Sequence, residues 1–321
     1  VFTFDSVENI QGSDGDDIYV TTASTGGIWI NATEGNDTLY GGVGSETLYG
    51  GIGNDVMYGG DGLGRDILFG DDNNDIIYSG DGDAIVYGGA GDDTFVDYYG
   101  TAQDHTFYGG DGYDQVSLHP LEGPTTTILT GDGSGTTTTD PGGSLTFESV
   151  EVIFGSNLED TFDGTASGTA LNFSAKAGND SLVGGSGSDR LYGGTGNDGL
   201  YGSEGKDTLI GCDGADSLII DGQYDPATDR VVDGVGDLLE GGAGNDTIGF
   251  GASIGGGFNN TGAGFFATVA GGALNAASSW SFSMVTKTSW ARWRRRLKST
   301  RSFVRSAAVS IGRCATGRDG S

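Results

Sequence analysis

The sequence has few of the residues that many active sites and small folds depend on. Its 321 residues include two cysteines, two histidines, two methionines and four prolines. Cys212 and Cys314 lie too far apart in the sequence to suggest a disulfide framework. The sequence contains no H-E-x-x-H zinc motif and no phosphate-binding P-loop. We therefore expect no catalytic centre, and hence no enzyme, within these residues.

Basic residues are also scarce until the end of the chain. Positions 1–286 contain 44 acidic and five basic residues, whereas positions 287–321 contain ten basic residues and one acidic residue. A body of this charge would repel nucleic acid and anionic membranes, and it would repel itself without counter-ions. A disordered acidic segment is one interpretation. Regularly spaced apolar residues favour a packed solenoid instead.

The N-terminus lacks a basic segment followed by an apolar run, so the sequence shows no secretory signal peptide. Thr3–Tyr19 closely parallels Thr146–Phe162. This similarity suggests that the chain begins at the boundary between two modules. We interpret the sequence as a fragment of a longer tandem array.

Glycine is abundant, with 64 copies, and much of it falls in a nine-residue repeat. The repeat reads G-G-x-G-x-D-x-U-x, where U is a large apolar residue; GGVGSETLY at 41–49 and GGTGNDGLY at 193–201 are clear copies. In the first tandem, the U positions are Leu39, Leu48, Met57, Leu68, Ile77, Val86, Phe95, Phe107 and Val116.

Each position of the repeat has a physical role. The last three residues alternate polar, apolar and polar, which predicts a strand too short to stand alone. The glycines permit φ > 0, so the chain can reverse direction every nine residues. Two units then form one coil of about eighteen residues, with coils stacked at roughly 4.8 Å and successive units on opposite sheets. The sequence therefore predicts an all-β parallel β-roll, which is a β-solenoid.

The aspartates of the repeat should stack along the edges of such a roll. Two carboxylates about 5 Å apart repel by several kcal/mol at an effective dielectric near 20. A hard cation between them reverses that energy, and loop carbonyls suit the six to eight oxygen ligands of calcium better than the strict octahedron of magnesium. We therefore predict several calcium ions held by Asp17, Asp37, Asp55, Asp66, Asp75, Asp93, Asp114, Asp160, Asp180, Asp189, Asp198, Asp207, Asp216, Asp237 and Asp246.

The two tandems differ in regularity. The units from Asp180 to Asp216 are uninterrupted, so we expect the best cation cage there. In the first tandem, the metal position holds Glu46, Ala84 and His105 in three units. Ala84 offers no ligand, and a histidine suits a hard cation poorly. We expect His105 to be a solvated substitution without catalytic partners.

The repeats resemble the repeats-in-toxin (RTX) calcium-binding nonapeptides of secreted bacterial proteins, and the resemblance covers most of Gln11–Gly249. It implies a parallel β-roll, type I secretion and folding when calcium is met outside the cell. The expected organisation is two rolls joined by a spacer. Its segments are 1–31 (the end of a preceding spacer and a first repeat), 32–117 (first roll), 118–154 (Thr-, Gly- and Pro-rich β-type spacer), 155–249 (second roll), 250–286 (uncharged and glycine-rich) and 287–321 (basic tail).

The nonapeptide repeat does not explain three further features of the sequence. Outward aromatic residues such as Tyr40 and Tyr58 favour stacking within a sheet; a strip that binds cell-surface glycans or other surface proteins is the alternative. Two fifteen-residue units at 252–281 resemble the head repeats of trimeric autotransporter adhesins, which are also solenoid turns. Their glycine, asparagine and serine content argues against a membrane span. The tail at 287–321 is either a basic element that binds membrane or nucleic acid, or the product of a reading-frame change.

Two functional classes follow from this reading. The first is a secreted, calcium-dependent module that serves as a spacer or adhesin-type structural region. The second is the accessory C-terminal region of a secreted toxin, protease, lipase or polysaccharide-modifying enzyme, with the catalytic domain outside this sequence. Further repeats in the flanking sequence would favour the first class, and a catalytic domain would favour the second.

Overall fold

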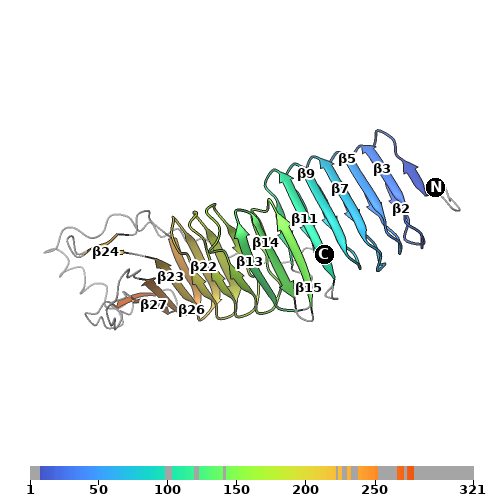
Figure 1. The fold of residues 1–321 in the computed structure, drawn as a ribbon. Coiled ribbons are helices and arrows are strands. Elements are labelled where there is room, and N and C mark those ends of the chain that lie inside the picture. The colour runs from blue at the N-terminus through green and yellow to red at the C-terminus, as the bar shows by residue number, and fades with distance from the viewer. Residues whose placement is uncertain are drawn as a thin grey trace.

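The computed structural model describes residues 8–97, 103–118, 123–139 and 142–221, together with the strands at 223–225, 230–232, 238–251, 266–270 and 273–277. After Ile220 it describes the backbone alone. These residues form an elongated stack of short strands (Figure 1). None of the described residues is helical, and accordingly no helix long and apolar enough to cross a membrane is found among them.

The first tandem forms two parallel sheets that face one another. Successive units alternate between them, as the nine-residue period predicts. Sheet A contains β1 (Asn9–Gln11), β3 (Trp29–Glu34), β5 (Thr47–Ile52), β7 (Asp66–Asp72), β9 (Ala84–Ala90) and β11 (Asp104–Asp111). Sheet B contains β2 (Ile18–Val20), β4 (Thr38–Tyr40), β6 (Val56–Tyr58), β8 (Ile76–Tyr78), β10 (Thr94–Val96) and β12 (Gln115–Ser117). The predicted β-solenoid is confirmed.

The apolar U residues fill the space between the two sheets. In sheet B, Leu39 pairs with Met57, Met57 with Ile77, and Ile77 with Phe95. All four side chains are fully buried. Each unit contributes one large side chain to the interior, so no coil has a core until it stacks on its neighbours.

Glycine is required where one loop rests directly on the next. Gly51 has φ near +111°, and a Cβ at this position would overlap the carbonyl oxygen of Thr33 in the preceding coil. A side chain here would therefore both strain the backbone and push two coils apart.

The outward aromatic residues stack on one another along each sheet. The ring centroids of Tyr40 and Tyr58 are 4.7 Å apart, and those of Tyr58 and Tyr78 are 4.5 Å apart. On sheet A, Tyr49 and Phe69 stack at 4.5 Å. These contacts confirm the stacking interpretation, with each pair contributing some tenths of a kcal/mol.

The Thr-rich segment at 118–154 is β-structured, as expected, and its strands lie within the wall of the solenoid. It contributes β13 (Thr125–Gly131), β14 (Ser134–Thr139) and β15 (Gly143–Glu148) to sheet A in the order β11-β15-β14-β13-β17, with β14 antiparallel to both of its neighbours. In the described part of this segment, sheet B gains one strand, β16 (Val152–Phe154), which pairs directly with β12. Figure 1 shows the two blocks of coils offset where β11 meets β15.

The second tandem repeats the alternation of the first. Sheet A continues with β17 (Thr161–Asp163), β19 (Ser181–Val183), β21 (Gly199–Tyr201) and β23 (Ser217–Asp221). Sheet B continues with β18 (Asn172–Ser174), β20 (Arg190–Thr195), β22 (Thr208–Gly214) and β26 (Leu238–Gly251), and β26 pairs with both β22 and β23. A separate antiparallel pair consists of β24 (Gln223–Asp225) and β25 (Arg230–Val232).

The glycine-rich segment beyond β26 is described only in part. β27 (Phe266–Ala270) pairs antiparallel with β26 and with β28 (Ala273–Ala277). This antiparallel pairing differs from the parallel coils of the two tandems. The rest of that segment and the basic tail at 287–321 lie outside the described residues.

We expect substitutions at two neighbouring positions of β10 to differ sharply in their effect on stability. Phe95 is fully buried and its ring lies 5.3 Å from that of Phe107, whereas Val96 is half-buried on the outer face. Phe95→Ala should lower the free energy of unfolding by about 3–5 kcal/mol through the cavity it leaves. Val96→Ala should cost much less. Urea unfolding in saturating calcium measures both, and equal losses would contradict this account of the core.

Candidate calcium-binding edges

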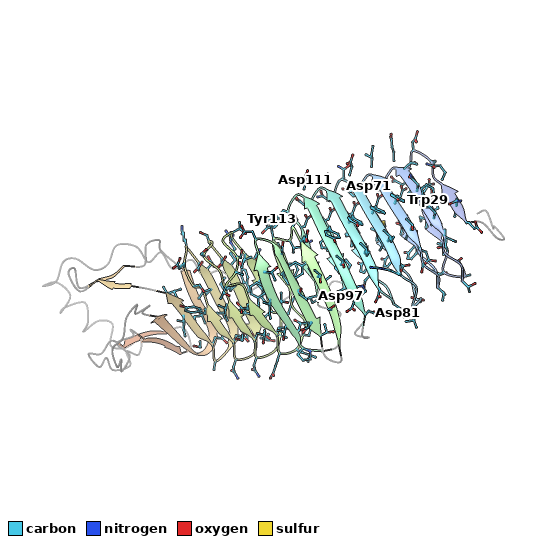
Figure 2. All side chains as sticks on the ribbon, in the orientation of Figure 1. Trp29, Asp71, Asp81, Asp97, Asp111 and Tyr113 are labelled. Atoms are coloured by element: carbon cyan, nitrogen blue, oxygen red, sulfur yellow. The ribbon has the colours of Figure 1, made fainter. Side chains whose placement is uncertain are left out.

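The loops that connect the two sheets form two edges of the solenoid. We call the loops that lead into strands of sheet B the B-entry edge, and those that lead into strands of sheet A the A-entry edge. In Figure 2, Asp71 and Asp111 lie along the B-entry edge, and Asp81 and Asp97 lie along the opposite one. The repeat aspartates come directly before the short strands, so each is fixed in position by the strand that follows.

On the B-entry edge the aspartates form a hydrogen-bonded ladder. The backbone N–H of each donates to the carboxylate Oδ1 of the next aspartate along the stack. The N–H of Asp55, for example, lies 2.7 Å from Oδ1 of Asp75. The donor–acceptor distances are 2.6–2.9 Å along the series Asp17, Asp37, Asp55, Asp75, Asp93 and Asp114.

The A-entry edge carries a similar ladder in the second tandem. Asp198 lies between Asp180 and Asp216, as the repeat predicts. The N–H of Asp180 donates to Oδ1 of Asp198 at 2.9 Å, and the N–H of Asp198 donates to Oδ1 of Asp216 at 3.0 Å. On the B-entry edge of this tandem, the N–H of Asp189 donates in the same way to Asp207.

A second ladder runs in the opposite direction beside the first. The residue before each aspartate is often asparagine, and its side-chain oxygen accepts from the N–H of the following coil. Asn36 accepts from Asn54 at 2.8 Å, and Asn54 accepts from Asn74 at 3.0 Å. The two ladders together tie each loop to its neighbour on both sides.

The second oxygen of most repeat carboxylates has no protein partner. These aspartates are at most 3% exposed, and Oδ2 accepts no hydrogen bond in Asp37, Asp55, Asp75, Asp93, Asp114, Asp180 and Asp198. A Cβ on the first glycine of a unit would overlap this oxygen, as at Gly70 beside Asp75 and at Gly193 beside Asp198. An unpaired buried carboxylate oxygen is strongly unfavourable unless a cation meets it.

Burial raises the pKa of these carboxyl groups. It raises the pKa of Asp75 to about 8, with the carboxylates of Asp55, Asp93 and Asp71 adding to the effect, while the N–H of Asp55 opposes it. Burial likewise raises the pKa of Asp93 and of Asp180 to about 7. These groups therefore hold protons near neutral pH unless a positive charge compensates them.

The donor set fits calcium. Among the described residues, no three histidine, cysteine, aspartate or glutamate side chains converge on one point. A cation beside Oδ2 would therefore complete its shell with loop carbonyls. Calcium accepts such mixed oxygen shells with flexible geometry. When bound, it would supply the positive charge that these buried carboxylates lack.

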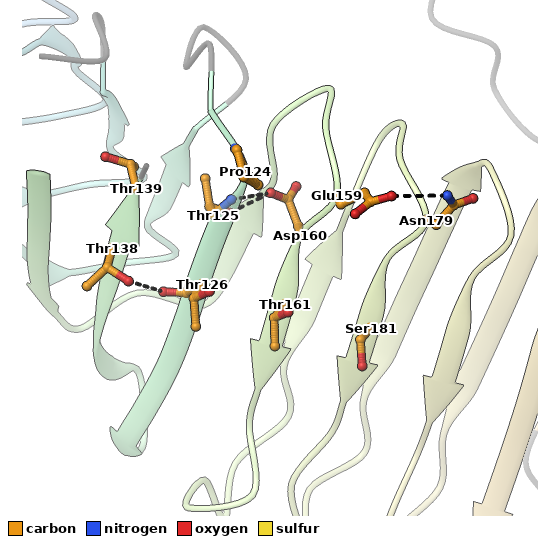
Figure 3. A pocket seen from close by; sticks show the side chains of 10 residues that line it. All are labelled: Pro124, Thr125, Thr126, Thr138, Thr139, Glu159, Asp160, Thr161, Asn179 and Ser181. Carbon is orange, nitrogen blue, oxygen red and sulfur yellow. Dashed lines mark hydrogen bonds between the residues drawn. The ribbon is translucent and has the colours of Figure 1, made fainter. Parts of the chain in front are cut away.

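Three predicted ligands are already satisfied by protein donors. Ser13 and Tyr19 donate to Oδ2 of Asp17. Leu171 and Gly185 donate to the two oxygens of Asp189. Asp160 lies beside Thr125 at a pocket of about 380 Å³ (Figure 3), where it accepts from Thr125 and Ser156. These three carboxylates offer less to a cation than the seven with an unpaired oxygen.

The irregular units of the first tandem, which lack an aspartate at the metal position, connect neighbouring loops through other residues. Glu46 donates from its backbone to Oδ1 of Asp66 at 2.8 Å, and burial raises the pKa of both carboxyl groups. The expectation that His105 is solvated is wrong, because its residue is 4% exposed and packs edge-on against Phe95. Its Nδ1 accepts from the N–H of Ala84 at 3.2 Å, where the other loops place a carboxylate oxygen.

The repeat pattern missed one carboxylate of the B-entry edge. Oε2 of Glu151 accepts from the N–H of Asp114 at 2.7 Å and so extends the ladder. The available signal was the strand-like run that follows Glu151, which places it directly before β16. Of the other predicted ligands, Asp237 lies outside the described residues, and only the backbone of Asp246 is described.

The fold and the edges together define a parallel β-solenoid with acid-lined loops suited to calcium. The model of the RTX calcium-binding nonapeptide repeat matches residues 31–63, 61–95, 174–209, 196–222 and 233–252. The chain therefore carries RTX calcium-binding repeats in these segments, and the repeats imply calcium binding.

Two of the solved structures that match show how limited the likeness is. The extracellular lipase LipA from Serratia marcescens is 16% identical, with a TM-score of 0.28; the match covers 75% of this chain and 44% of the lipase. A hyperactive, Ca2+-dependent, β-helical antifreeze protein from an Antarctic bacterium is 18% identical, with a TM-score of 0.31, and the match covers 77% and 79% of the two chains. No curated protein matches significantly.

The raised pKa values predict an unusual pH dependence without calcium. A carboxyl group whose pKa rises from 3.8 to about 8 on folding, as at Asp75, stabilises the fold fully at low pH and loses that contribution as pH rises through about 8. In chelator, stability should therefore fall between about pH 4 and 8. Asp75→Asn should flatten part of the profile, whereas Asp72→Asn, at an exposed neighbour, should not. The folded fraction in chelator, followed by circular dichroism at stepped pH, measures this; identical profiles for the two variants would contradict it.

Proposed function

We propose that this chain is a calcium-dependent folding module of a secreted protein, a stiff spacer or adhesin-type stalk that forms when calcium is met outside the cell. The observation that carries the proposal is the series of buried aspartates with one unpaired carboxylate oxygen. Such a series is costly in the folded state without cations and favourable with them. Calcium binding and folding are therefore coupled.

The electrostatics give this coupling its direction. Positions 1–286 carry 44 acidic residues against five basic ones, so the repeats cannot neutralise themselves with lysine or arginine. Where calcium is scarce, repulsion and the small core of each coil favour the unfolded chain. Where calcium is plentiful, each bound ion removes an unpaired charge and joins two loops, so that folding of one coil promotes folding of the next.

The proposal assigns this region no chemistry of its own. The buried histidine has Ala84 and Asp97 as its polar neighbours, with Nε2 lying 3.6 Å from Oδ1 of Asp97. The repeat carboxylates are engaged by the backbone of neighbouring loops. We therefore propose a structural role, with any catalytic activity residing in another part of the parent protein.

Calcium should control the amount of β-structure. In chelator at neutral pH the chain should be largely unfolded, and about 5 mM calcium, above the range typical of extracellular modules, should produce β-structure cooperatively. Circular dichroism across a calcium titration measures this, with magnesium at equal concentration as the control. A spectrum that is the same in chelator and in calcium would overturn the proposal.

We expect a single repeat carboxylate to affect the calcium midpoint of folding by binding calcium at its own site, and not through the net charge of the chain. Asp198→Asn keeps an acceptor for the N–H of Asp180 but removes the charge beside the unpaired oxygen. It should raise the calcium midpoint of folding about ten-fold, or about 1.4 kcal/mol.

The matched control is Glu204→Gln, which removes one charge from an exposed position of the same tandem. Its midpoint should stay near that of the wild type. Equal shifts in the two variants would mean that the acids act only through net charge.

A further inference from the structure

The B-entry edge stays continuous across the Thr-rich insertion. Asp114 and Glu151 are 37 positions apart, yet they occupy adjacent coils, because β12 pairs directly with β16. The N–H of Asp114 donates to Oε2 of Glu151 at 2.7 Å. In return, the N–H groups of Glu151 and Val152 donate to the carbonyl oxygen of Asp114 at 3.0 and 3.1 Å.

A short loop takes the place of the six-residue glycine loop here. Ser149 adopts φ near +56°, a left-handed conformation that glycine supplies in the regular loops. Its carbonyl oxygen points at Gly109, as the carbonyl oxygen of Gly109 points at Gly88 in the preceding coil. The carbonyl group of Ser149 therefore occupies the position that the carbonyl group of a repeat glycine occupies in the regular coils, although the residue is a serine.

At this junction, one buried carboxylate oxygen has no hydrogen-bond partner. Asp114 is fully buried; its Oδ1 accepts from the N–H of Asp93, and its Oδ2 has no partner. A Cβ built on Gly109 would overlap both this Oδ2 and the carbonyl oxygen of Ser149. Both oxygens therefore pack against Gly109 on the same side and lie close to one another, and the half-buried carboxylate of Glu151 stands at the next level of the stack.

We propose that Asp114, the carbonyl group of Ser149 and Glu151 form a calcium site that joins the first tandem to the coil after the insertion. The inference rests on the proposed function, since it assumes that calcium binds the edges. The segments that match the RTX repeat end at 95 and resume at 174, so this site lies outside them. Asp114 comes from the last nonapeptide of the first tandem, whereas on the other side a glutamate and a short loop take the place of the nonapeptide.

The site has a consequence for how the chain folds. In sheet A the run of parallel strands is broken here by β14, which is antiparallel to both of its neighbours, whereas in sheet B β12 pairs directly and in parallel with β16. An ion held by both Asp114 and Glu151 makes the two coils bind calcium together. Folding then passes from one tandem to the other along the B-entry edge.

Glu151→Gln in the full chain tests the site. Glutamine can still accept from the N–H of Asp114, so only the charge is lost. The variant should bind one calcium ion fewer in equilibrium dialysis. Amides of β12 and β16 should require about ten-fold more calcium for protection from hydrogen exchange. Glu148→Gln, at an exposed position on β15, should behave as the wild type.

A double-mutant cycle with Asp114→Asn gives a second readout. If the two carboxylates share an ion, losing either should remove most of the effect, and the double variant should be little worse than the worse single variant. Independent effects, or full calcium stoichiometry in Glu151→Gln, would overturn the site. A wild-type chain that takes up no calcium would instead refute the proposed function.

Discussion

The structure depends on a carboxylate placed between two stacked loops. Each repeat aspartate gives its backbone N–H to the aspartate of one neighbouring coil and accepts the N–H of the other, as Asp55 does between Asp37 and Asp75. The same side chain therefore sets the spacing of the coils and places a negative charge in a buried position. Hydrogen bonding holds neighbouring loops together, while the unpaired oxygen makes the stability of the folded loops depend on whether a cation lies beside it.

Backbone contact between loops explains where the solenoid tolerates change. A Cβ on Gly51 would overlap the preceding loop, so the regular loops accept little variation. Sheet A accommodates three further strands, β15, β14 and β13, between β11 and β17, because they continue the hydrogen-bonded sheet without altering a regular loop. The B-entry edge has no such freedom, and at that point it is carried forward by Glu151.

The sequence was sufficient to predict the regular coils, because their period determines both the sheet and the face of every residue. It predicted that Asp180, Asp198 and Asp216 stack on one edge, and they do. It did not predict Glu151, because that residue meets Asp114 only through a pairing across the insertion. Nor did it predict the burial of His105, whose Nδ1 accepts from the N–H of Ala84 in the neighbouring coil. Both depend on contacts between coils, which the repeat does not encode.

The coil that contains His105 separates two roles that the aspartates combine. There the N–H of Ala84 is satisfied by Nδ1 of an imidazole, and burial lowers the pKa of His105 to about 4, so the acceptor is neutral. A loop of this solenoid thus needs an acceptor at that point, but it does not need a charge. An asparagine or a neutral histidine would meet the same N–H with a smaller desolvation cost than a carboxylate. Hydrogen bonding alone therefore leaves the charge of the buried aspartates unexplained, and binding of a cation supplies the missing reason.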